Sequence, residues 1–366
     1  MSAFRTIDRD GPIRIVQVGA GGMGRAWLRT IADDPDVTLV GLVDLNLDTA
    51  RTALVEAGIR GDIALGTGLA AVAAEARADA VVNVTIPEAH LPVNREALAA
   101  GLPVLCEKPA APVIADAFRQ AAASEVFGEL LMISQSRRYF AALDAARALL
   151  PTIGAVSSVS TRFFREAHFP GFREEMAHPL LIDMAIHQFD VARALVGAEP
   201  VSVVCDEHSP SWSWFDGAAD AHAVFRFADG ARYVFTGSWV AVGEQTSWNG
   251  EWRIDGEGGT IRWDGEGAVT LARAGARDAP ERIEVPQGAP EQIAGSLKEF
   301  IGALRGGQSP ESTALANIHS LAMVFSATRA ADTGERVDIE GVRRRALADA
   351  IATEQDPEVI ARLREL

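Results

Sequence analysis

The segment IRIVQVGAGGMG at residues 13–24 constrains the fold more than any other part of the chain. A short apolar run ends at a glycine-rich turn and a helix-like pattern follows, so G-x-G-x-x-G comes directly after a predicted strand. In such a unit the first glycine allows a tight turn, the second lets the backbone approach a pyrophosphate, and the third lets the helix pack closely on its strand. The free N–H groups at the helix start also attract phosphate. The segment therefore predicts a dinucleotide site formed by Gly19, Gly21, Gly22, Met23 and Gly24.

A second predicted strand, 37–44, ends in the acidic residue Asp44. An acid about 20 residues after the glycines can accept hydrogen bonds from the adenosine ribose hydroxyls and repels a 2′-phosphate. These features predict NAD as the cofactor, with NADP as the alternative. Arg51 is the nearby cation that could favour NADP, although its place in a predicted helix also fits a solvated side chain. A Rossmann-like domain that has lost its cofactor would carry the same glycine-rich turn.

The first third of the chain alternates between strand and helix patterns. The predicted strands are 13–19, 37–43, 80–85, 103–106 and 129–136, and the predicted helices are 23–33, 46–57, 69–76, 89–100 and 111–123. Such alternation favours a parallel sheet with helices on both faces, the doubly wound Rossmann arrangement of an α/β protein.

The pattern changes near residue 150, where strands follow one another with turn signals between them. The predicted strands are 155–164, 201–207, 222–227, 232–240, 252–255, 260–263, 268–273 and 282–286, and the predicted helices are 177–196, 291–304 and 313–332. This succession predicts an α+β domain with a large, mostly antiparallel sheet. We therefore expect a Rossmann domain at 1–128, an α+β domain at 129–340 whose last helices could return to the first domain, and a charged helical tail at 341–366.

Charge and cysteine content exclude several classes of function. The 366 residues carry a formal net charge of −16, so the general surface is unsuited to nucleic acid or to an anionic membrane. The two cysteines are far apart in the sequence, form no disulfide framework or thiolate cluster, and fit a reducing cytosol. We see no secretory signal and no run of about 18 apolar residues, so the sequence predicts a cytoplasmic protein without a transmembrane helix.

Hydride transfer from an alcohol carbon to a nicotinamide also requires a base that removes the hydroxyl proton. Lys108 lies at the end of a predicted parallel strand, the edge at which open α/β sheets bind their ligands. Partial burial and a positively charged nicotinamide would both lower the pKa of this lysine toward neutrality. Lys108 is therefore the candidate acid/base, and an exposed loop lysine is the alternative. Pro109 fixes the chain direction after it and allows a cis peptide bond.

Asp183, His187 and Asp190 are spaced so that they would share one face of a helix. His187 can donate or accept a proton near neutral pH, and Asp183 could hold a substrate hydroxyl or orient the imidazole. Asp190 has a supporting role in this interpretation. The alternative for His187 is a buried histidine whose hydrogen bonds are satisfied by its neighbours.

No metal site is predicted. Asp183, His187, His178 and Asp190 could in principle ligate zinc, but no compact cysteine or His-x-x-x-His pattern supports this. His178 could line a pocket or serve in capping or loop packing. The tryptophan and phenylalanine residues after residue 160 could stack on a sugar ring, although a place in the sheet core or at a subunit interface is the simpler role.

Three short motifs, in this order and spacing, resemble the glucose–fructose oxidoreductase, inositol dehydrogenase and MocA (Gfo/Idh/MocA) family. They are the glycine turn at 19–24, TIPEAH at 85–90 followed by VLCEKP at 104–109, and DMAIHQFD at 183–190. Many members have a glycine run just before the third motif. Here MAHPL at 176–180 replaces it, which leaves the shape of the substrate pocket open.

The resemblance also implies roles for individual residues. It implies that the loop carrying Thr85, Pro87 and His90 passes the nicotinamide ribose, and that Glu107 contacts the same region. It supports Lys108 both as a cofactor contact and as the catalytic acid/base, with His187 and Asp183 completing the catalytic set.

The activity implied by the resemblance is that of an NAD(P)-dependent oxidoreductase, with NAD preferred. Its substrate would be a secondary hydroxyl or ketone on a sugar, cyclitol or related polyol, and it would form a homodimer or homotetramer. The resemblance implies that the domain at 129–340 serves substrate binding and oligomerisation. Two alternatives stay open: NAD-assisted elimination or hydrolysis of a glycoside, and a non-catalytic nicotinamide-binding regulator. Dihydrodiol or imino substrates are also open.

Overall fold

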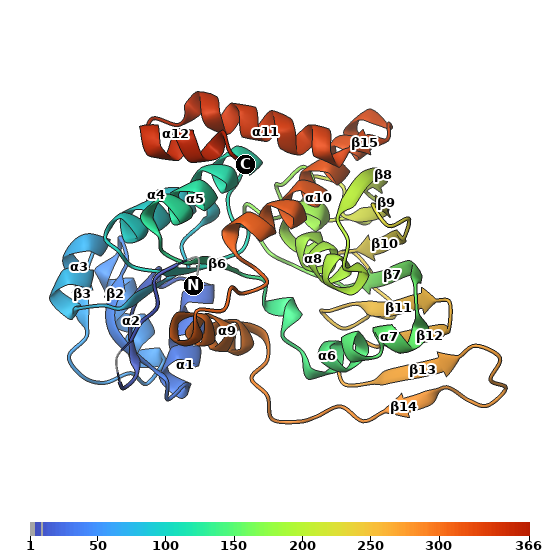
Figure 1. The fold of residues 1–366 in the computed structure, drawn as a ribbon, viewed down its shortest axis with the longest axis horizontal. Coiled ribbons are helices and arrows are strands. Elements are labelled where there is room, and N and C mark those ends of the chain that lie inside the picture. Colours follow the sequence, from blue (N-terminus) through green and yellow to red (C-terminus); the bar gives the residue numbers. More distant parts are fainter. Residues whose placement is uncertain (1–3, 9) are drawn as a thin grey trace. The chain divides into compact units, whose positions relative to one another are not determined.

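The computed structural model describes residues 4–8 and 10–366, which fold into two compact units (Figure 1). The first unit contains the residues up to Gln135 together with 293–318 and 345–366, and the second contains 136–292 and 319–344. Two helices, α10 (Ala314–Thr333) and α11 (Ile339–Thr353), each contribute residues to both units.

The first unit is built on a parallel sheet. Its strands are β1 (Ile13–Val18), β2 (Val37–Val43), β3 (Ala64–Gly66), β4 (Ala80–Asn83), β5 (Val104–Glu107) and β6 (Leu131–Ser134). Its helices are α1 (Gly22–Asp33), α2 (Leu47–Glu56), α3 (Leu69–Ala76), α4 (Pro87–Ala99), α5 (Ile114–Phe127), α9 (Gln292–Gly306) and α12 (Pro357–Leu363). The strand order is β3-β2-β1-β4-β5-β6, with α1 and α2 on one face and α4 and α5 on the other (Figure 1). The predicted doubly wound Rossmann fold is confirmed.

One unit boundary and one strand end differ from the positions expected from the sequence, each for a physical reason. The sequence places the end of the first domain at 128, whereas the first unit continues to Gln135 because β6 pairs with β5. β4 ends at Asn83 rather than at residue 85 because the Asn83 side chain accepts hydrogen bonds from the backbone N–H and the hydroxyl of Thr85. Such an Asx turn ends an extended segment.

Chain order in the sheet reverses between β1 and β4. In open parallel sheets the ligand crevice lies at the carboxyl ends of the strands that flank such a reversal. The glycine turn follows β1, the loop beginning at Val84 follows β4, and Lys108 follows β5, so all three segments start at the same edge.

The second unit is built on a larger sheet. Its strands are β7 (Val156–Phe164), β8 (Pro200–His208), β9 (Asp220–Phe227), β10 (Arg232–Ser238), β11 (Glu251–Gly256), β12 (Gly259–Trp263), β13 (Val269–Arg273), β14 (Glu281–Ile283) and β15 (Val337–Asp338). Its helical segments are η1 (Ser136–Arg138), α6 (Ala141–Ala148), α7 (Leu150–Ile153), the π-helical turn η2 (Leu180–Met184) and α8 (Ala185–Val196). The order is β14-β13-β12-β11-β7-β10-β9-β8-β15. Only β7 and β10 pair in parallel among these described strands, so the prediction of a mostly antiparallel sheet is confirmed.

Helix α8 covers one face of this sheet through an aromatic cluster. The ring of Phe189 lies 4.8 Å from that of Phe225, 6.0 Å from that of Tyr233 and 5.4 Å from that of Phe235, all edge-on. Edge-on contacts are favoured between aromatic rings and add to the free energy gained from burial. The helix ends at Gly197, which has a left-handed φ of 72°, the conformation that glycine commonly adopts just after a helix.

Several local predictions about the second unit were wrong. The helix expected at 177–196 begins as the π-helical turn η2, and α8 itself starts only at Ala185. The strand expected at 252–255 extends to Gly256, because Gly256 still pairs with Gly259 in the ladder. The short elements β15, α6 and α7 were not predicted, nor was β3 in the first unit, because elements of this length carry little periodic pattern.

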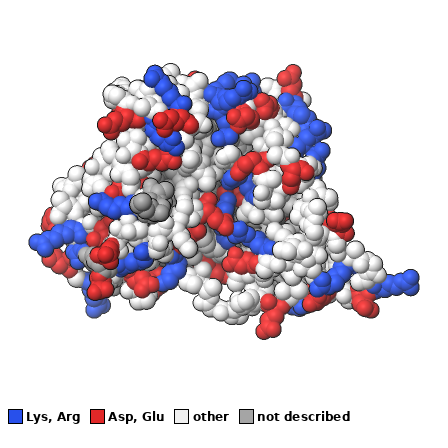
Figure 2. Space-filling model, in the orientation of Figure 1, with Lys and Arg blue, Asp and Glu red and all other residues white. Residues whose placement is uncertain are grey.

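The surface carries charges of both signs. Figure 2 shows Lys and Arg side chains interspersed with Asp and Glu side chains on the face in view. A search of the described residues for a helix with the length and apolar character needed to cross a bilayer finds none.

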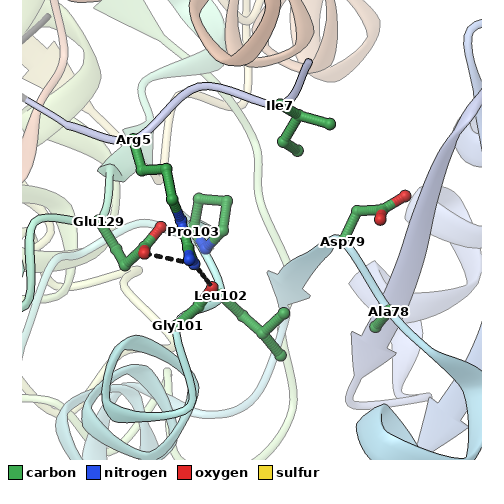
Figure 3. Close-up of a pocket in the computed structure, with 8 residues that line it drawn as sticks. All are labelled: Arg5, Ile7, Ala78, Asp79, Gly101, Leu102, Pro103 and Glu129. Atoms are coloured by element: carbon green, nitrogen blue, oxygen red, sulfur yellow. Dashed lines mark hydrogen bonds and ion pairs between the residues drawn. The ribbon is translucent and has the colours of Figure 1, made fainter. Parts of the chain in front are cut away.

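A cavity of about 200 Å³ lies at the amino ends of β4 and β5, on the edge of the sheet opposite the carboxyl crevice (Figure 3). Arg5 reaches over it and bonds both the carbonyl of Gly101 and, at 2.5 Å, the Glu129 carboxylate. Burial raises the pKa of Glu129 to about 7, although the Arg5 cation opposes that rise.

Glu129 should make the stability of the protein depend on pH. Its pKa is higher in the folded state than in the unfolded chain, so its favourable contribution is complete below about pH 4.5 and is lost as the pH rises through about 7. Glu129→Gln, which stays neutral, should therefore lose less unfolding free energy between pH 5 and pH 8 than the parent, by roughly 2 kcal/mol. Urea unfolding at several pH values measures this. Parallel stability curves for the two proteins would contradict it.

Candidate active site

The shape of the glycine turn depends on close backbone contacts. Gly19 has a φ of +100°, and a β-carbon there would lie 2.6 Å from the carbonyl oxygen of Val84. A β-carbon on Gly24 would lie 2.4 Å from the carbonyl oxygen of Gly19. At Gly21 and Gly22, by contrast, a β-carbon would meet nothing within 4 Å. The outer two glycines therefore fix the turn, and the middle ones face open space, as a close approach by a pyrophosphate requires.

A buried side chain that sequence reasoning missed also holds this turn. Gln17, within β1, donates hydrogen bonds from Nε2 to the carbonyl oxygens of Gly19 (2.8 Å) and Gly24 (2.9 Å). The single amide thus ties the start of the turn to the first residues of α1. The only signal in the sequence is a polar residue inside the apolar run at 13–18.

The start of α1 is suited to an anion. Its N-cap residue is Gly21, no side chain caps it, and its first turn contains no acidic residue. The first N–H groups of a helix have no partner within the helix and lie at the positive end of its dipole. A phosphate is the usual acceptor for such groups. Met23, in the same turn, is half exposed.

Asp44 lies against the glycine turn at the end of β2. One carboxylate oxygen accepts a hydrogen bond from the backbone N–H of Ala20 and the other from that of Asn46, both at 2.8 Å. Each carboxylate oxygen has a further lone pair that can accept a hydroxyl. Arg51 is exposed and pairs with Asp48 at 2.9 Å, so it is engaged by another acid on its own helix.

Glu107 joins two elements of the first unit. Its buried carboxylate accepts a hydrogen bond from the indole N–H of Trp27 in α1 (2.7 Å) and one from the backbone N–H of Lys108 (3.1 Å). Burial raises the pKa of this carboxyl group, and these donors and the Lys108 charge oppose the rise. Lys108 itself is half-buried, and the Lys108–Pro109 peptide bond is cis.

His90 lies in the interior between the loops that follow β4 and β5. Nδ1 is 2.8 Å from the carbonyl oxygen of Pro109, and Nε2 is 3.1 Å from that of Thr85. Burial lowers the pKa of His90, so the ring is neutral at pH 7 and its single N–H donates to one of these carbonyls. The ring therefore connects the two loops rather than extending into the crevice. Pro87 occupies the first turn of α4, where its missing N–H costs nothing.

A chain of buried amides supports the same loops. Asn83 donates to Asn94 (2.8 Å), Asn94 to Gln120 (2.8 Å), and Gln120 to the carbonyl oxygen of Ala110 (2.6 Å). All three side chains are fully buried. The chain runs from the end of β4 through α4 and α5 to the residue after Pro109. The sequence did not point to Asn94 or Gln120, because each is an isolated polar residue in a helix.

In the second unit, Asp183 lies in η2 and forms an ion pair with Arg173, whose Nε is 2.8 Å from Oδ2. His187 is buried in the first turns of α8. We expected Asp183, His187 and Asp190 on a single helix. The π-helical turn instead separates Asp183 from the regular helix that carries the other two residues.

Asp190 belongs to a buried ion pair. Arg138 contacts both of its oxygens, at 2.5 and 3.0 Å, and the hydroxyl of Ser320 donates to it at 2.6 Å. A buried pair with this many donors is a structural contact, since loss of one partner would leave the other charge uncompensated. This fits the supporting role expected for Asp190.

His178 is also paired. Its Nδ1 lies 2.6 Å from Glu207 and its Nε2 lies 3.5 Å from Asp332. The neighbouring Glu207 carboxylate raises the pKa of His178. Over residues 4–8 and 10–366, no three His, Cys, Asp or Glu side chains gather as potential metal ligands.

Comparison with known proteins adds to this geometry. A family model described as an oxidoreductase family with an NAD-binding Rossmann fold matches residues 13–134, and the model of the GFO/IDH/MocA C-terminal domain matches residues 116–262. A protein of Sinorhizobium fredii, described as uncharacterized protein y4oX, is 29% identical over 345 residues, which cover 89% of this chain and 96% of that protein.

Two further proteins are similar along most of their length. Inositol 2-dehydrogenase 1 of Saccharopolyspora erythraea is 26% identical over 341 residues, covering 90% of this chain and 96% of that enzyme. The crystal structure of an oxidoreductase from Agrobacterium radiobacter in complex with NAD+, L-tartaric acid and magnesium has a TM-score of 0.79 and 20% identity, covering 90% of this chain and 99% of that one.

The two family models together extend from β1 to β12, and the glycine turn of the first unit has the features that a dinucleotide requires. The chain is an NAD-binding oxidoreductase that belongs to the Gfo/Idh/MocA family.

Proposed function

We propose that the protein is an NAD-dependent dehydrogenase that interconverts a secondary hydroxyl and a ketone on a sugar, cyclitol or related polyol. The observation that carries the proposal is the position of Lys108, which follows β5 at the carboxyl edge of the sheet whose β1 leads into the glycine turn. Similarity to inositol 2-dehydrogenase 1 along most of both chains supports a polyol substrate.

The first unit offers a separate group of residues for each part of the dinucleotide. Gly19, Gly21, Gly22, Met23 and Gly24 would hold the pyrophosphate at the start of α1, and Asp44 would accept the adenosine ribose hydroxyls. Thr85, Pro87 and Lys108 would lie along the nicotinamide ribose. Glu107 and His90 would act through the loops that they hold rather than by direct contact.

When bound, NAD supplies the acceptor for the hydride that leaves the alcohol carbon. The remaining requirement is the hydroxyl proton, which we assign to the Lys108 amine as acid/base. Asp183 would hold a substrate hydroxyl, and His187 would orient the substrate and share the proton transfer. Glu107 and the amide chain keep Lys108 at a fixed place, which matters because a base must lie within hydrogen-bond reach of the proton.

We further propose that the protein forms a homodimer or homotetramer through the nine-stranded sheet. Val204, Val224 and Val234 line a shallow groove on the sheet, at strand positions that alternate with the buried core residues. Val234→Asp should shift the protein to a smaller species in light scattering coupled to gel filtration. A parent that is already monomeric would contradict the proposal.

Asp44 should determine the preference for NAD. Asp44→Asn removes the negative charge, so the dissociation constant for NAD should rise about tenfold while binding of NADP improves. Calorimetric titration with both cofactors measures the ratio, and Asp62→Asn, an exposed acid of the same unit, is the control. An unchanged ratio of NAD to NADP affinity would sink this assignment.

Lys108→Met should abolish turnover while keeping the cofactor. Because general acid–base catalysis contributes about 10²–10⁴-fold, kcat on a panel of sugars, inositols and other polyols should fall by that factor. The dissociation constant for NAD should change by only a few-fold.

The same panel distinguishes the rival functions. Equal turnover by the parent and Lys108→Met would remove Lys108 from the chemistry. A parent that reduces no NAD with any alcohol, yet retains the cofactor tightly, would instead support redox-assisted glycoside elimination or a regulator.

A further inference from the structure

We propose that Arg173 binds a carboxylate of the substrate, so that the substrate is an acidic polyol such as an aldonic or uronic acid. The inference rests on the proposed function, in which Asp183 and His187 hold the substrate. It adds a substrate class that the family membership leaves open.

The first observation is the contact between Arg173 and a proposed substrate-binding residue. Nε of Arg173 donates to Oδ2 of Asp183 at 2.8 Å. Asp183 in turn lies in the π-helical turn that leads directly into α8 and His187. A guanidinium therefore lies beside the carboxylate that would hold a substrate hydroxyl.

The second observation concerns the part of Arg173 that Asp183 does not use. The side chain is 39% exposed, and the Nε contact is the one hydrogen bond it makes within the described chain. The two terminal nitrogens thus retain N–H groups arranged as a planar fork. This fork matches the two oxygens of a carboxylate, which it can bind bidentately.

The third observation is an aromatic support beneath the guanidinium. Arg173 lies 5.6 Å from the ring centre of Phe169 and 4.9 Å from that of Phe172. Phe169 is itself fixed, because it packs against Trp239 at 5.5 Å and Trp248 at 6.3 Å. Both distances are within the range of a cation–π contact, so the rings attract the guanidinium and favour its present position.

Phe172 adds an exposed aromatic ring beside Arg173, which a purely structural ion pair would not need. The ring is 66% exposed, an unusual position for a phenylalanine. The neighbouring acid Glu174 does not compete for the guanidinium through Oε1, because that oxygen accepts the backbone N–H of Phe169 at 2.9 Å. An exposed ring next to unused N–H groups forms a surface that is apolar on one side and cationic on the other.

The carboxylate takes no part in the bond changes. During oxidation the carbon–hydrogen pair of electrons leaves with the hydride for NAD⁺, the hydroxyl proton passes to the base, and a ketone forms. Arg173 acts only on binding and orientation. Its contribution should therefore be larger in KM than in kcat, and it should be absent with a neutral polyol of the same shape.

The test uses matched substrate pairs and the full chain with NAD. The pairs are D-gluconate with D-glucitol and D-galacturonate with D-galactose, and D-glucose 6-phosphate is the phosphate probe. The variants are Arg173→Gln and Arg173→Lys. The control is Arg273→Gln, which removes an exposed arginine of the same unit that is also paired with a carboxylate, Glu281 at 3.4 Å.

The parent should have a kcat/KM at least about tenfold higher for the acid of a pair than for its neutral partner. Arg173→Gln should lose that advantage, mainly through KM, and should change kcat/KM for the neutral partner less than about threefold. Arg173→Lys should keep part of the advantage, because an ammonium ion is a point charge without the fork. Arg273→Gln should match the parent.

A second readout, which needs no turnover, is the binding of D-gluconate to the complex of the protein with NADH. Calorimetric titration measures this binding. Weaker binding by Arg173→Gln than by the parent would support the proposal. Equal loss on acidic and neutral substrates would mean that Arg173 only positions Asp183, and would overturn it. A higher kcat/KM for D-glucose 6-phosphate than for either acid would overturn the proposal of a carboxylate, and would indicate that Arg173 binds a phosphate. Good turnover of neutral polyols alone would overturn the carboxylate but leave the dehydrogenase function standing.

Discussion

The buried carboxylate of Glu107 is the contact on which the crevice of the first unit depends. It accepts a hydrogen bond from Trp27 in the helix that follows the glycine turn and another from the backbone of Lys108. One acceptor therefore connects the expected phosphate-binding element and the expected acid/base. Displacing either donor would leave a buried carboxylate poorly satisfied, at a cost of about 1–3 kcal/mol or more. The place of Lys108 is thus determined by the core of the unit and not by a surface loop.

Much of this fold can be predicted from the sequence because its signals are local. Gly19 and Gly24 stand where a β-carbon would collide with backbone, so their spacing reflects a geometric requirement that no other residue meets. The apolar runs with helices between them predict the parallel sheet. The later succession of alternating strands predicts the mostly antiparallel sheet. The position of Asp44 at the end of the second strand follows from the same pattern.

The parts of the fold and of the candidate site that the sequence did not predict depend on contacts between separate segments. A linear pattern does not reveal such contacts. Gln17 looks like a stray polar residue in a strand until its amide is seen to bridge two glycine carbonyls. Arg173 carries no motif, and its contact with Asp183 cannot be inferred from a linear pattern. The spacing of Asp183, His187 and Asp190 predicted one regular helix. The structure has two segments there, because η2 is a π-helical turn and α8 begins only after it.

The buried amides that support the loops after β4 and β5 have a consequence for how the protein responds to its surroundings. Asn83, Asn94 and Gln120 have no proton to gain or lose near neutrality, and burial keeps His90 uncharged at pH 7. These amides and His90 therefore keep the same hydrogen bonds across the neutral pH range, whereas Glu107, whose pKa burial raises, is a titratable group in the framework around Lys108. A titration seen in the activity of this oxidoreductase would then report on the reacting groups and on Glu107, and not on the amides that support the two loops.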